Sequence, residues 1–468
     1  MQIYRPYPRL LGLLASVVFL AACGGPQTSN GAPGLAAGSA LPRQTDPAQR
    51  RFTPRFGSGS TPITHVVIII QENRTVDNLF NSLPGADTAQ TGLNSSQQTV
   101  SLMPESLSAD YDLIHTHSAW AIDYANGNLN DFNLAPSKCK KGSVCPNRAV
   151  RAYAYVPESQ VQPYYDLAEQ YTFADRMFET NQGPSFPAHQ YLISGTSAIS
   201  DGSDLRASEN PNTKSAKVGG CDSPARSTVA VIDPSGNESQ KVYPCFERTA
   251  LMQELDSAGL SWHYYQERQG AGLWNAVDAI KPLWHTADFR NVISPSAQVL
   301  TDIAAGNLAN VTWITPSAAA SDHALLTDGS GPSWVSSIVN EIGQSQYWDS
   351  TAIFVIWDDW GGWYDHVQPP IYNSYELGFR VPMIVISPYA KQGYISHVQH
   401  EFGSILKFTE ENFGLPSMGT TDERADDLSD CFNFFRMHPR FRHISAPLGP
   451  QYFRKLRHAK DDLPDTDY

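Results

Sequence analysis

Two long apolar segments, far apart along the chain, carry the clearest structural signal in the sequence. Residues 351–357 (TAIFVIW) and residues 64–70 (THVVIII) are rich in β-branched and aromatic side chains. Such runs are typical of strands that are buried on both faces of a parallel sheet. The same patterns predict two further strands and two helices: residues 310–316, 381–387, 334–342 and 404–413. The predicted fold is α/β, with a central, mostly parallel sheet sandwiched by helices.

Polar residues follow both apolar segments. Glu72 and Asn73 come just after the first, and Asp358 and Asp359 come directly after the second. Open α/β sheets bind ligands at the carboxyl ends of their strands. No Lys or Arg lies between residues 290 and 380, and a divalent cation would supply the missing charge partner. If the two strands are neighbours, four oxygen ligands converge. The alternative for the aspartates is an acidic turn that caps the next helix.

A third motif places a serine at the start of a predicted helix. Ser185 belongs to the segment QGPSFPAHQYLISG, in which Pro187 suits a first helical turn and Gly195 suits a C-terminal cap. The positive field at a helix N-terminus favours a bound phosphate. An N-cap role for Ser185 fits the same pattern, and both roles can hold together.

Three histidines are candidates for chemistry. His115 lies in the segment DLIHTH, His323 follows the predicted strand 310–316, and His366 follows a third acid, Asp365. His323 and His366 each follow a strand end beside an acid that can orient the ring. Four other histidines receive no role: His117, His189, His263 and His285.

The N-terminal segment predicts export. Residues 1–22 have two early arginines, an apolar stretch and small residues before Cys23, as a lipoprotein signal peptide does. Cys23 would then carry the lipid, whereas ordinary secretory cleavage would leave it incidental. Residues 23–60 are predicted to form a flexible tether, and residues 61–468 a single catalytic domain. The expected location is the bacterial cell envelope, periplasmic or at the cell surface, with the lipid anchor as the only membrane contact.

The remaining cysteines predict disulfides. In an exported protein, the pairs Cys139–Cys145 and Cys221–Cys245 are expected to close surface loops. The competing prediction is a zinc site, but neither pair has CxxC spacing. Cys431 is left over and is expected to be a buried thiol.

Composition narrows the class of partner. The chain has 468 residues, 41% hydrophobic and 17% charged, with a formal net charge of -14. This charge argues against nucleic acid as a partner, because phosphate backbones select surfaces rich in Lys and Arg. It leaves phosphate esters possible as substrates, since a bound metal reverses the local field.

Three separated segments resemble one family. The segments HVVIIIQENRTVDNLF, GPSFPAHQYLISGTS and WDDWGGWYDHVQPP are similar to the bacterial phosphoesterases that include secreted phospholipases C and acid phosphatases. The resemblance covers roughly residues 61–413 and has the motifs in the family's order. It implies an alkaline-phosphatase-like fold.

The resemblance also implies roles for the candidate residues. The implied metal ligands are Glu72, Asn73, Ser185, Asp358 and Asp359. Ser185 would be the nucleophile that forms a phosphoserine. His115, His323 and His366 would hold phosphate oxygens or protonate the leaving group. One or more divalent ions are implied, and Ca, Mg, Mn and Zn all stay open.

Two segments depart from the family pattern. The usual Pro-Asn after the nucleophile is here Pro187-Ala188-His189, and the segment N-G-x-M-D-G-F is here NGNLNDF. The predicted function is a metal-dependent phosphoric ester hydrolase of acid phosphatase or phospholipase C type, acting on a phosphate monoester or on a phosphodiester such as a phospholipid. The alternatives are a non-enzymatic surface lipoprotein and a sulfatase-like esterase on the same fold. The latter needs an arginine that the sequence after Ser185 lacks.

Overall fold

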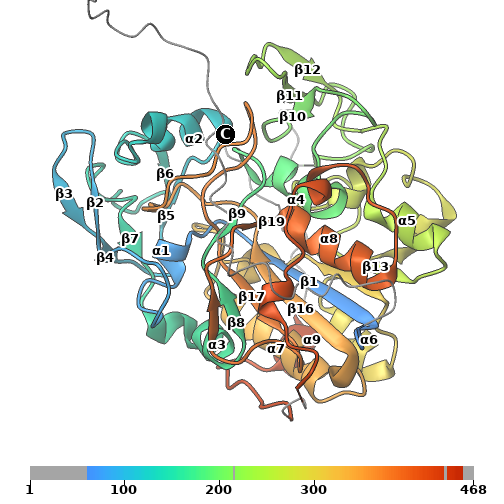
Figure 1. Cartoon of the computed structure of the whole chain (residues 1–468). Helices are drawn as coiled ribbons and strands as arrows, with labels where there is room; N and C mark the ends of the chain where they lie inside the picture. Colours follow the sequence, from blue (N-terminus) through green and yellow to red (C-terminus); the bar gives the residue numbers. More distant parts are fainter. Residues whose placement is uncertain (1–60, 214–216, 437–439, 457–468) are drawn as a thin grey trace, which may run out of the picture. The chain divides into compact units, whose positions relative to one another are not determined.

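An eight-stranded sheet forms the centre of the computed structural model (Figure 1), which describes residues 61–213, 217–436 and 440–456. The strand order is β14–β13–β15–β1–β16–β17–β8–β18. In chain order the strands are β1 (His65–Gln71), β8 (Thr172–Ala174), β13 (Trp262–Tyr265), β14 (Val292–Ile293), β15 (Val311–Ile314), β16 (Thr351–Trp357), β17 (Met383–Ile386) and β18 (Tyr394–Ser396). β17 is antiparallel to both of its neighbours, and every other neighbouring pair is parallel. The predicted mostly parallel sheet is confirmed.

The two long apolar segments are neighbouring strands within this sheet. β1 and β16 pair in parallel, in a register that runs from His65 opposite Thr351 to Gln71 opposite Trp357. Every residue of β16 is buried, and so is every residue of β1 after His65. Because the two strands end level with each other, the polar residues that follow them leave the sheet at the same edge. From the sequence, the convergence of these residues depended on the two strands being neighbours, and the structure shows that they are.

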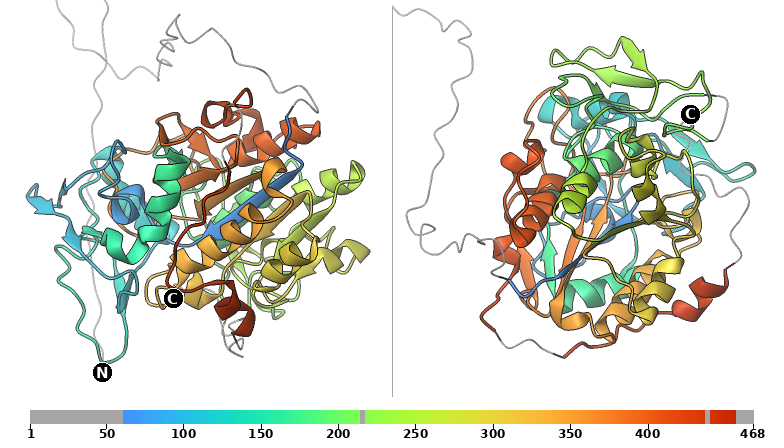
Figure 2. Two further views of the ribbon diagram at one scale, coloured as in Figure 1. Left: turned by 90° about the horizontal axis from the view of Figure 1, so that it is seen from below. Right: turned by 90° about the vertical axis from the view of Figure 1, so that its right-hand side faces the viewer.

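Helices cover both faces of the sheet (Figure 2). Four of them pack against one another: α3 (Glu158–Gln170), α6 (Gln298–Ala305), α7 (Gly331–Gly343) and α9 (Pro450–Lys455). A second group consists of α4 (Ser185–Ser194), α5 (Leu251–Ser257) and α8 (Phe402–Phe413). The helices predicted at residues 334–342 and 404–413 are confirmed as α7 and α8, which begin two or three residues earlier than expected.

Most of the smaller elements belong to the long segment between β1 and β13. They are α1 (Val76–Leu79), β2 (Thr91–Leu93), β3 (Thr99–Ser101), β4 (Met103–Pro104), β5 (Tyr111–Leu113), α2 (His117–Tyr124), β6 (Ser137–Cys139), β7 (Ala154–Tyr155), β9 (Met177–Phe178), β10 (Arg206–Ala207), β11 (Val229–Ile232) and β12 (Gln240–Val242). A later element, β19 (His400–Glu401), pairs with β9. Residues of this segment and residues from later in the chain form two apolar clusters apart from the main core, one around Trp360 and Trp363 and one around Phe186 and Trp274.

Both predicted disulfides are present. Cys139 is bonded to Cys145 and Cys221 to Cys245, and Cys431 is a free, buried cysteine as expected. The predicted signal peptide, the lipidation site Cys23 and the tether lie outside the described residues. Within the described ranges, no helix is both long and apolar enough to cross a bilayer.

Candidate active site

The ends of β1 and β16 place four polar side chains together. Asp358 N–H donates to Gln71 O (2.9 Å), which continues the strand pairing one residue beyond the apolar segment. Asp358 Oδ1 then accepts two backbone hydrogen bonds, from Asn73 N (3.0 Å) and from Asp359 N (2.8 Å). Glu72, Asn73 and both aspartates are fully buried. The structure therefore brings together the four side chains that the sequence singled out at the strand ends.

A glycine turn lets the two strand ends approach this closely. Gly361 has a φ of +62°, and a Cβ atom there would lie 2.4 Å from Asn73 O. Its N–H donates to Asp359 Oδ1 (2.7 Å). Because an L-side chain meets both a positive φ and a backbone clash at this position, only glycine keeps Asp359 beside Asn73 without strain.

Ser185 is the first residue of α4 and faces the aspartates. Its Oγ donates to Asp359 Oδ2 at 3.2 Å, and the side chain is fully buried. Pro184 occupies the N-cap position, and no side chain caps the helix there. The N-cap alternative for Ser185 is therefore wrong, whereas Gly195 is the left-handed C-cap that the sequence predicted.

His189 joins the same group one helical turn later. Residues four apart in a helix share a face, so His189 points to the same edge of the sheet as Ser185. Its Nε2 lies 3.0 Å from Glu72 Oε1 and 3.6 Å from Asp358 Oδ2. Burial lowers the pKa of His189 to about 4, although the charge of Asp358 opposes that shift. The ring is therefore neutral near pH 7, the form in which imidazole binds a metal.

Two of the three predicted histidines lie beside this group. His115 Nδ1 contacts Leu113 O (2.7 Å), while its Nε2 lies 2.8 Å from Asn73 Nδ2 and 4.0 Å from Asp359 Oδ2. The His323 ring lies 5.6 Å from the His115 ring between centroids, and its Nδ1 contacts Ala324 O at 2.6 Å. In both rings a backbone carbonyl holds Nδ1, which assigns the hydrogen to that nitrogen.

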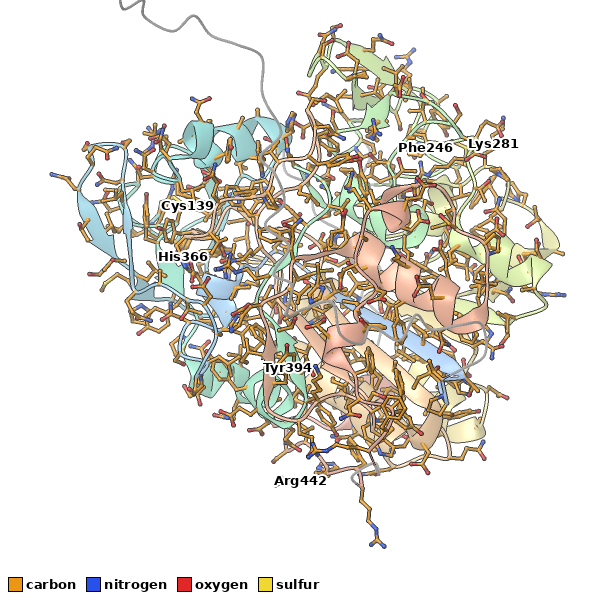
Figure 3. The ribbon with its side chains drawn as sticks, viewed as in Figure 1. Cys139, Phe246, Lys281, His366, Tyr394 and Arg442 are labelled. Carbon is orange, nitrogen blue, oxygen red and sulfur yellow. A yellow bond between two sulfur atoms is a disulfide. The ribbon has the colours of Figure 1, made fainter. Side chains whose placement is uncertain are left out.

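The third predicted histidine belongs to a different cluster. His366 lies near α1 (Figure 3), where its Nδ1 is 2.7 Å from Asp77 Oδ2 and its Nε2 is 3.2 Å from Asp87 Oδ1. Burial would lower the pKa of His366, but the hydrogen bond and charge of Asp77 raise it above the ordinary value. The preceding acid, Asp365, accepts from Arg380 Nε at 2.9 Å. The structure therefore does not bring His366 together with Ser185.

The group at the strand ends fits a divalent cation. Asn73 Oδ1 and Asp358 Oδ2 are buried oxygens that accept no hydrogen bond from the described part of the chain. Leaving such an acceptor unsatisfied costs about 1–3 kcal/mol, and a bound cation would remove that cost. One ligand atom from each of Glu72, His189 and Asp358 lies within 4.8 Å of the other two. Carboxylate, amide and imidazole groups are all donors that divalent metals accept.

Glu179 adds another carboxyl group to this region. It is fully buried, and its Oε1 accepts from Phe379 N at 3.0 Å. Burial first, and then the negative charges of Asp359 and Asp358, raise the pKa of Glu179 well above its usual range. Glu179 is therefore close enough to both aspartates to respond to their charges, although burial is the larger cause of the shift. Sequence reasoning missed Glu179, since no spacing pattern connects it with the aspartates.

A cavity of about 100 Å³ lies beyond the end of β15. Its lining includes Thr315 and Ala318, just beyond β15, and Trp274, whose ring is 6.4 Å from the His323 ring between centroids. Trp274 also packs in the same apolar cluster as Phe186, the residue after Ser185. A larger cavity of about 580 Å³ is lined by residues around Gly195, at the opposite end of α4 from Ser185. The smaller cavity is thus linked to His323 through the Trp274 ring, whereas Ser185 and the strand-end residues do not line it.

A family comparison decides the class of this site. Residues 63–416 match the model of the phosphoesterase family. The chain belongs to this family. As a phosphoesterase, it is a hydrolase that acts on phosphoric ester bonds.

Individual relatives of this phosphoesterase are distant. Phospholipase C B of Mycobacterium tuberculosis is 25% identical over 459 residues, covering 81% of this chain and 80% of the relative. Non-hemolytic phospholipase C of Pseudomonas aeruginosa is 24% identical over 430 residues, covering 80% of this chain and 57% of the relative. Among solved structures, a protein of the alkaline phosphatase superfamily from Vibrio parahaemolyticus is similar with a TM-score of 0.38 and 10% identity, covering 80% of this chain and 71% of that one.

Proposed function

We propose that this phosphoesterase is a metal-dependent hydrolase of phospholipase C type that acts through a covalent intermediate on Ser185. The observation that carries the proposal is the convergence at the strand ends. Ser185 Oγ lies 3.2 Å from Asp359 Oδ2, beside the candidate ligand group of Glu72, His189 and Asp358. The phospholipase C activity named for the relatives in Mycobacterium tuberculosis and Pseudomonas aeruginosa supports the same substrate class.

The proposed metal ligands are the side chains that surround the buried oxygens: Glu72, Asn73, Ser185, His189, Asp358 and Asp359. A divalent cation held there would supply Lewis-acid stabilisation of the phosphate and would lower the pKa of an oxygen nucleophile. His189 adds a nitrogen donor that sequence reasoning did not include. An imidazole beside carboxylates suits Mn or Zn better than Ca or Mg, which prefer oxygen ligands.

Ser185 would attack the phosphorus of a phospholipid. Its Oγ–P bond forms while the bond from phosphorus to the glycerol oxygen breaks, so that the headgroup phosphate remains on the serine. The hydroxyl hydrogen points toward Asp359 Oδ2, the acceptor that takes it. A protonated imidazole, from His115 or His323, donates the hydrogen that the departing diacylglycerol oxygen needs. Water then releases the phosphorylated headgroup and restores Ser185.

The cavity lined by Trp274 suits the headgroup. It is small, about 100 Å³, and its lining mixes the indole of Trp274 with charged residues such as Asp222 and Arg268. Trp274 Nε1 is buried and donates to no acceptor in the described part of the chain. A headgroup oxygen in the cavity could accept that hydrogen, while the acyl chains remain outside. We expect this cavity to make the enzyme prefer diesters that carry a headgroup over simple monoesters.

The test combines substrate choice, metal removal and trapping of the intermediate. Purified protein is treated with a chelator, supplied with Mn, Zn, Ca or Mg in turn, and assayed on nitrophenyl phosphate and nitrophenyl phosphocholine. An acid quench during turnover should leave phosphocholine on the peptide that contains Ser185. Ser185→Ala should lose at least about a thousandfold in kcat and show no label.

Ser194→Ala is the matched control, because Ser194 is a buried serine at the far end of the same helix. It should keep both activity and label. Near-normal turnover by a correctly folded Ser185→Ala protein would refute the covalent route. Full activity in chelator without added metal would refute the metal dependence, and turnover of the monoester alone would refute the phospholipase C assignment.

A further inference from the structure

A second cluster of metal-binding side chain types lies away from Ser185, at the edge strand β18. It contains His400 from β19, together with Asp430 and Cys431 from the short 3-10 helix η8 (Ser429–Cys431). In the sheet, β17 and β8 separate β18 from β16, the strand that carries the candidate active site. The cluster therefore shares no residue with the proposed catalytic group.

The spacing of the three ligand atoms matches a tetrahedral zinc site. Asp430 Oδ1 lies 3.7 Å from His400 Nε2 and 3.5 Å from Cys431 Sγ. Zinc bonds to oxygen, nitrogen and sulfur are about 2.0–2.3 Å, which separates ligand atoms in a tetrahedron by roughly 3.3–3.8 Å. Both measured distances fall in that range. The third pair, nitrogen and sulfur, lies within 4.8 Å.

Surrounding groups hold the ligands in the orientation that a metal needs. His400 Nδ1 lies 2.7 Å from Asp426 Oδ1, which assigns a hydrogen to Nδ1 and directs Nε2 toward the other two ligands. Asp426 is itself fixed by Ser404 Oγ at 2.7 Å. Carboxylate–histidine pairs of this kind orient the histidine ligands of zinc in many proteins.

A serine orients the third ligand. Ser396 Oγ donates to Asp430 Oδ2 at 2.5 Å, which turns the other oxygen, Oδ1, toward Cys431. Ser396 Oγ also lies 2.9 Å from His400 Nε2. Zinc would take the place of the hydrogen on Cys431 Sγ, because cysteine binds a metal as the thiolate. Asp430 keeps 22% of its side chain exposed, so an ion and a fourth, water ligand can reach the cluster.

The cluster of Asp77, Asp365 and His366 does not offer such a site. There Arg380 Nε lies 2.9 Å from Asp365 Oδ1 and Arg380 Nη2 lies 3.7 Å from Asp77, so a cation already neutralises the acids. At β18 the described ion pairs of Asp426 and Asp430 are both with His400. The β18 cluster also provides a thiol, which the Asp365 cluster lacks.

We propose that His400, Asp430 and Cys431 bind a structural zinc ion that joins η8 to β18 and β19. The ligand set of one thiolate, one imidazole and one carboxylate is typical of zinc among the common divalent metals. This site is additional to the proposed catalytic metal, and it does not depend on which metal the catalytic group holds.

Cobalt substitution tests the proposal on the full-length protein. Cobalt bound to a thiolate gives a strong near-ultraviolet charge-transfer absorption that oxygen and nitrogen ligands do not give. We expect this band in the wild-type protein and in Asp358→Asn, which alters only the catalytic group. We expect its loss in Cys431→Ser and in His400→Gln, together with about one equivalent less zinc by elemental analysis.

Asp427→Asn is the matched control, since Asp427 is the neighbouring acid and its Oδ1 instead accepts from Ser429 N at 3.0 Å. It should retain both the band and the zinc. Absence of the cobalt band in the wild-type protein, or a zinc content that Cys431→Ser leaves unchanged, would overturn the proposal.

Discussion

The neutral, buried imidazole of His189 makes a prediction that needs no substrate. Burial holds the pKa of His189 at about 4, against an ordinary value of 6.5, despite the nearby charge of Asp358. The native protein therefore keeps this ring neutral at pH values where the unfolded chain protonates it. We expect His189→Gln to change how the free energy of unfolding depends on pH.

Proton linkage gives the sign and the size of this change in the free energy of unfolding. Between pH 6.5 and about 4 the unfolded state binds more protons at this group than the native state does, so lowering the pH favours unfolding. The stability is complete above pH 6.5 and is lost as the pH falls toward 4. At about 1.4 kcal/mol per pH unit, the interval corresponds to about 3 kcal/mol. In His189→Gln this contribution disappears, and the pH profile becomes flatter by that amount.

Urea denaturation of chelator-treated protein, followed by tryptophan fluorescence at pH 6.5, 5 and 4, measures the difference. Chelation is needed because a bound metal would add its own proton linkage. His443→Gln serves as the control, since His443 is exposed and lies outside the site. If wild type and His189→Gln lose stability in parallel as the pH falls, His189 is not a buried neutral group and its place among the ligands is wrong.

Three other changes have defined outcomes. Gly361→Ala should lower the free energy of unfolding by more than about 1 kcal/mol, because the positive φ and the 2.4 Å approach of a Cβ atom to Asn73 O both oppose a side chain. An unchanged midpoint of urea denaturation would contradict this. Trp274→Phe removes Nε1 but keeps a ring, so KM should rise several-fold for nitrophenyl phosphocholine and stay constant for nitrophenyl phosphate; equal effects on both would remove the headgroup argument. Replacing Cys221 and Cys245 by serine opens a bond between residues 24 positions apart and should cost about 3–4 kcal/mol in the chain-entropy model; a loss below 1 kcal/mol would show that the loop is held by other contacts.

The strand ends were the most predictable part of this molecule. An apolar run followed by polar residues indicates both burial and chain direction, so β1 and β16 could be predicted from the sequence together with the polar residues at their ends. Their pairing could not, because nothing in one strand encodes the identity of its neighbour. The structure shows that β1 pairs with β16 in register, which brings the pair Glu72 and Asn73 together with the pair Asp358 and Asp359.

Histidines were harder to predict. His189 carried a usable signal, its four-residue spacing from Ser185 on a predicted helix, but a single spacing does not reveal what faces the helix. For His366 the sequence was misleading, because the adjacent Asp365 suggested a role in catalysis. Its actual partners, Asp77 and Asp87, come from a distant segment, and Arg380 takes up the acid beside it. The local sequence does not indicate whether a histidine will bind the acid next to it or an acid from a distant segment.

The two backbone hydrogen bonds to Asp358 Oδ1 have a consequence for ion selectivity. With that oxygen held by Asn73 N and Asp359 N, Asp358 can offer a cation a single oxygen, Oδ2. Asp359 Oδ1 is similarly engaged by Gly361 N, so that Oδ2 is the oxygen facing Ser185. Asp358, whose Oδ1 already accepts two hydrogen bonds, would thereby be restricted to monodentate ligation, whereas Asp359 Oδ1 accepts a single one. If the proposed metal binds here, the loss of bidentate ligation at Asp358 would disfavour calcium, which fills six to eight positions and often takes carboxylates in bidentate fashion.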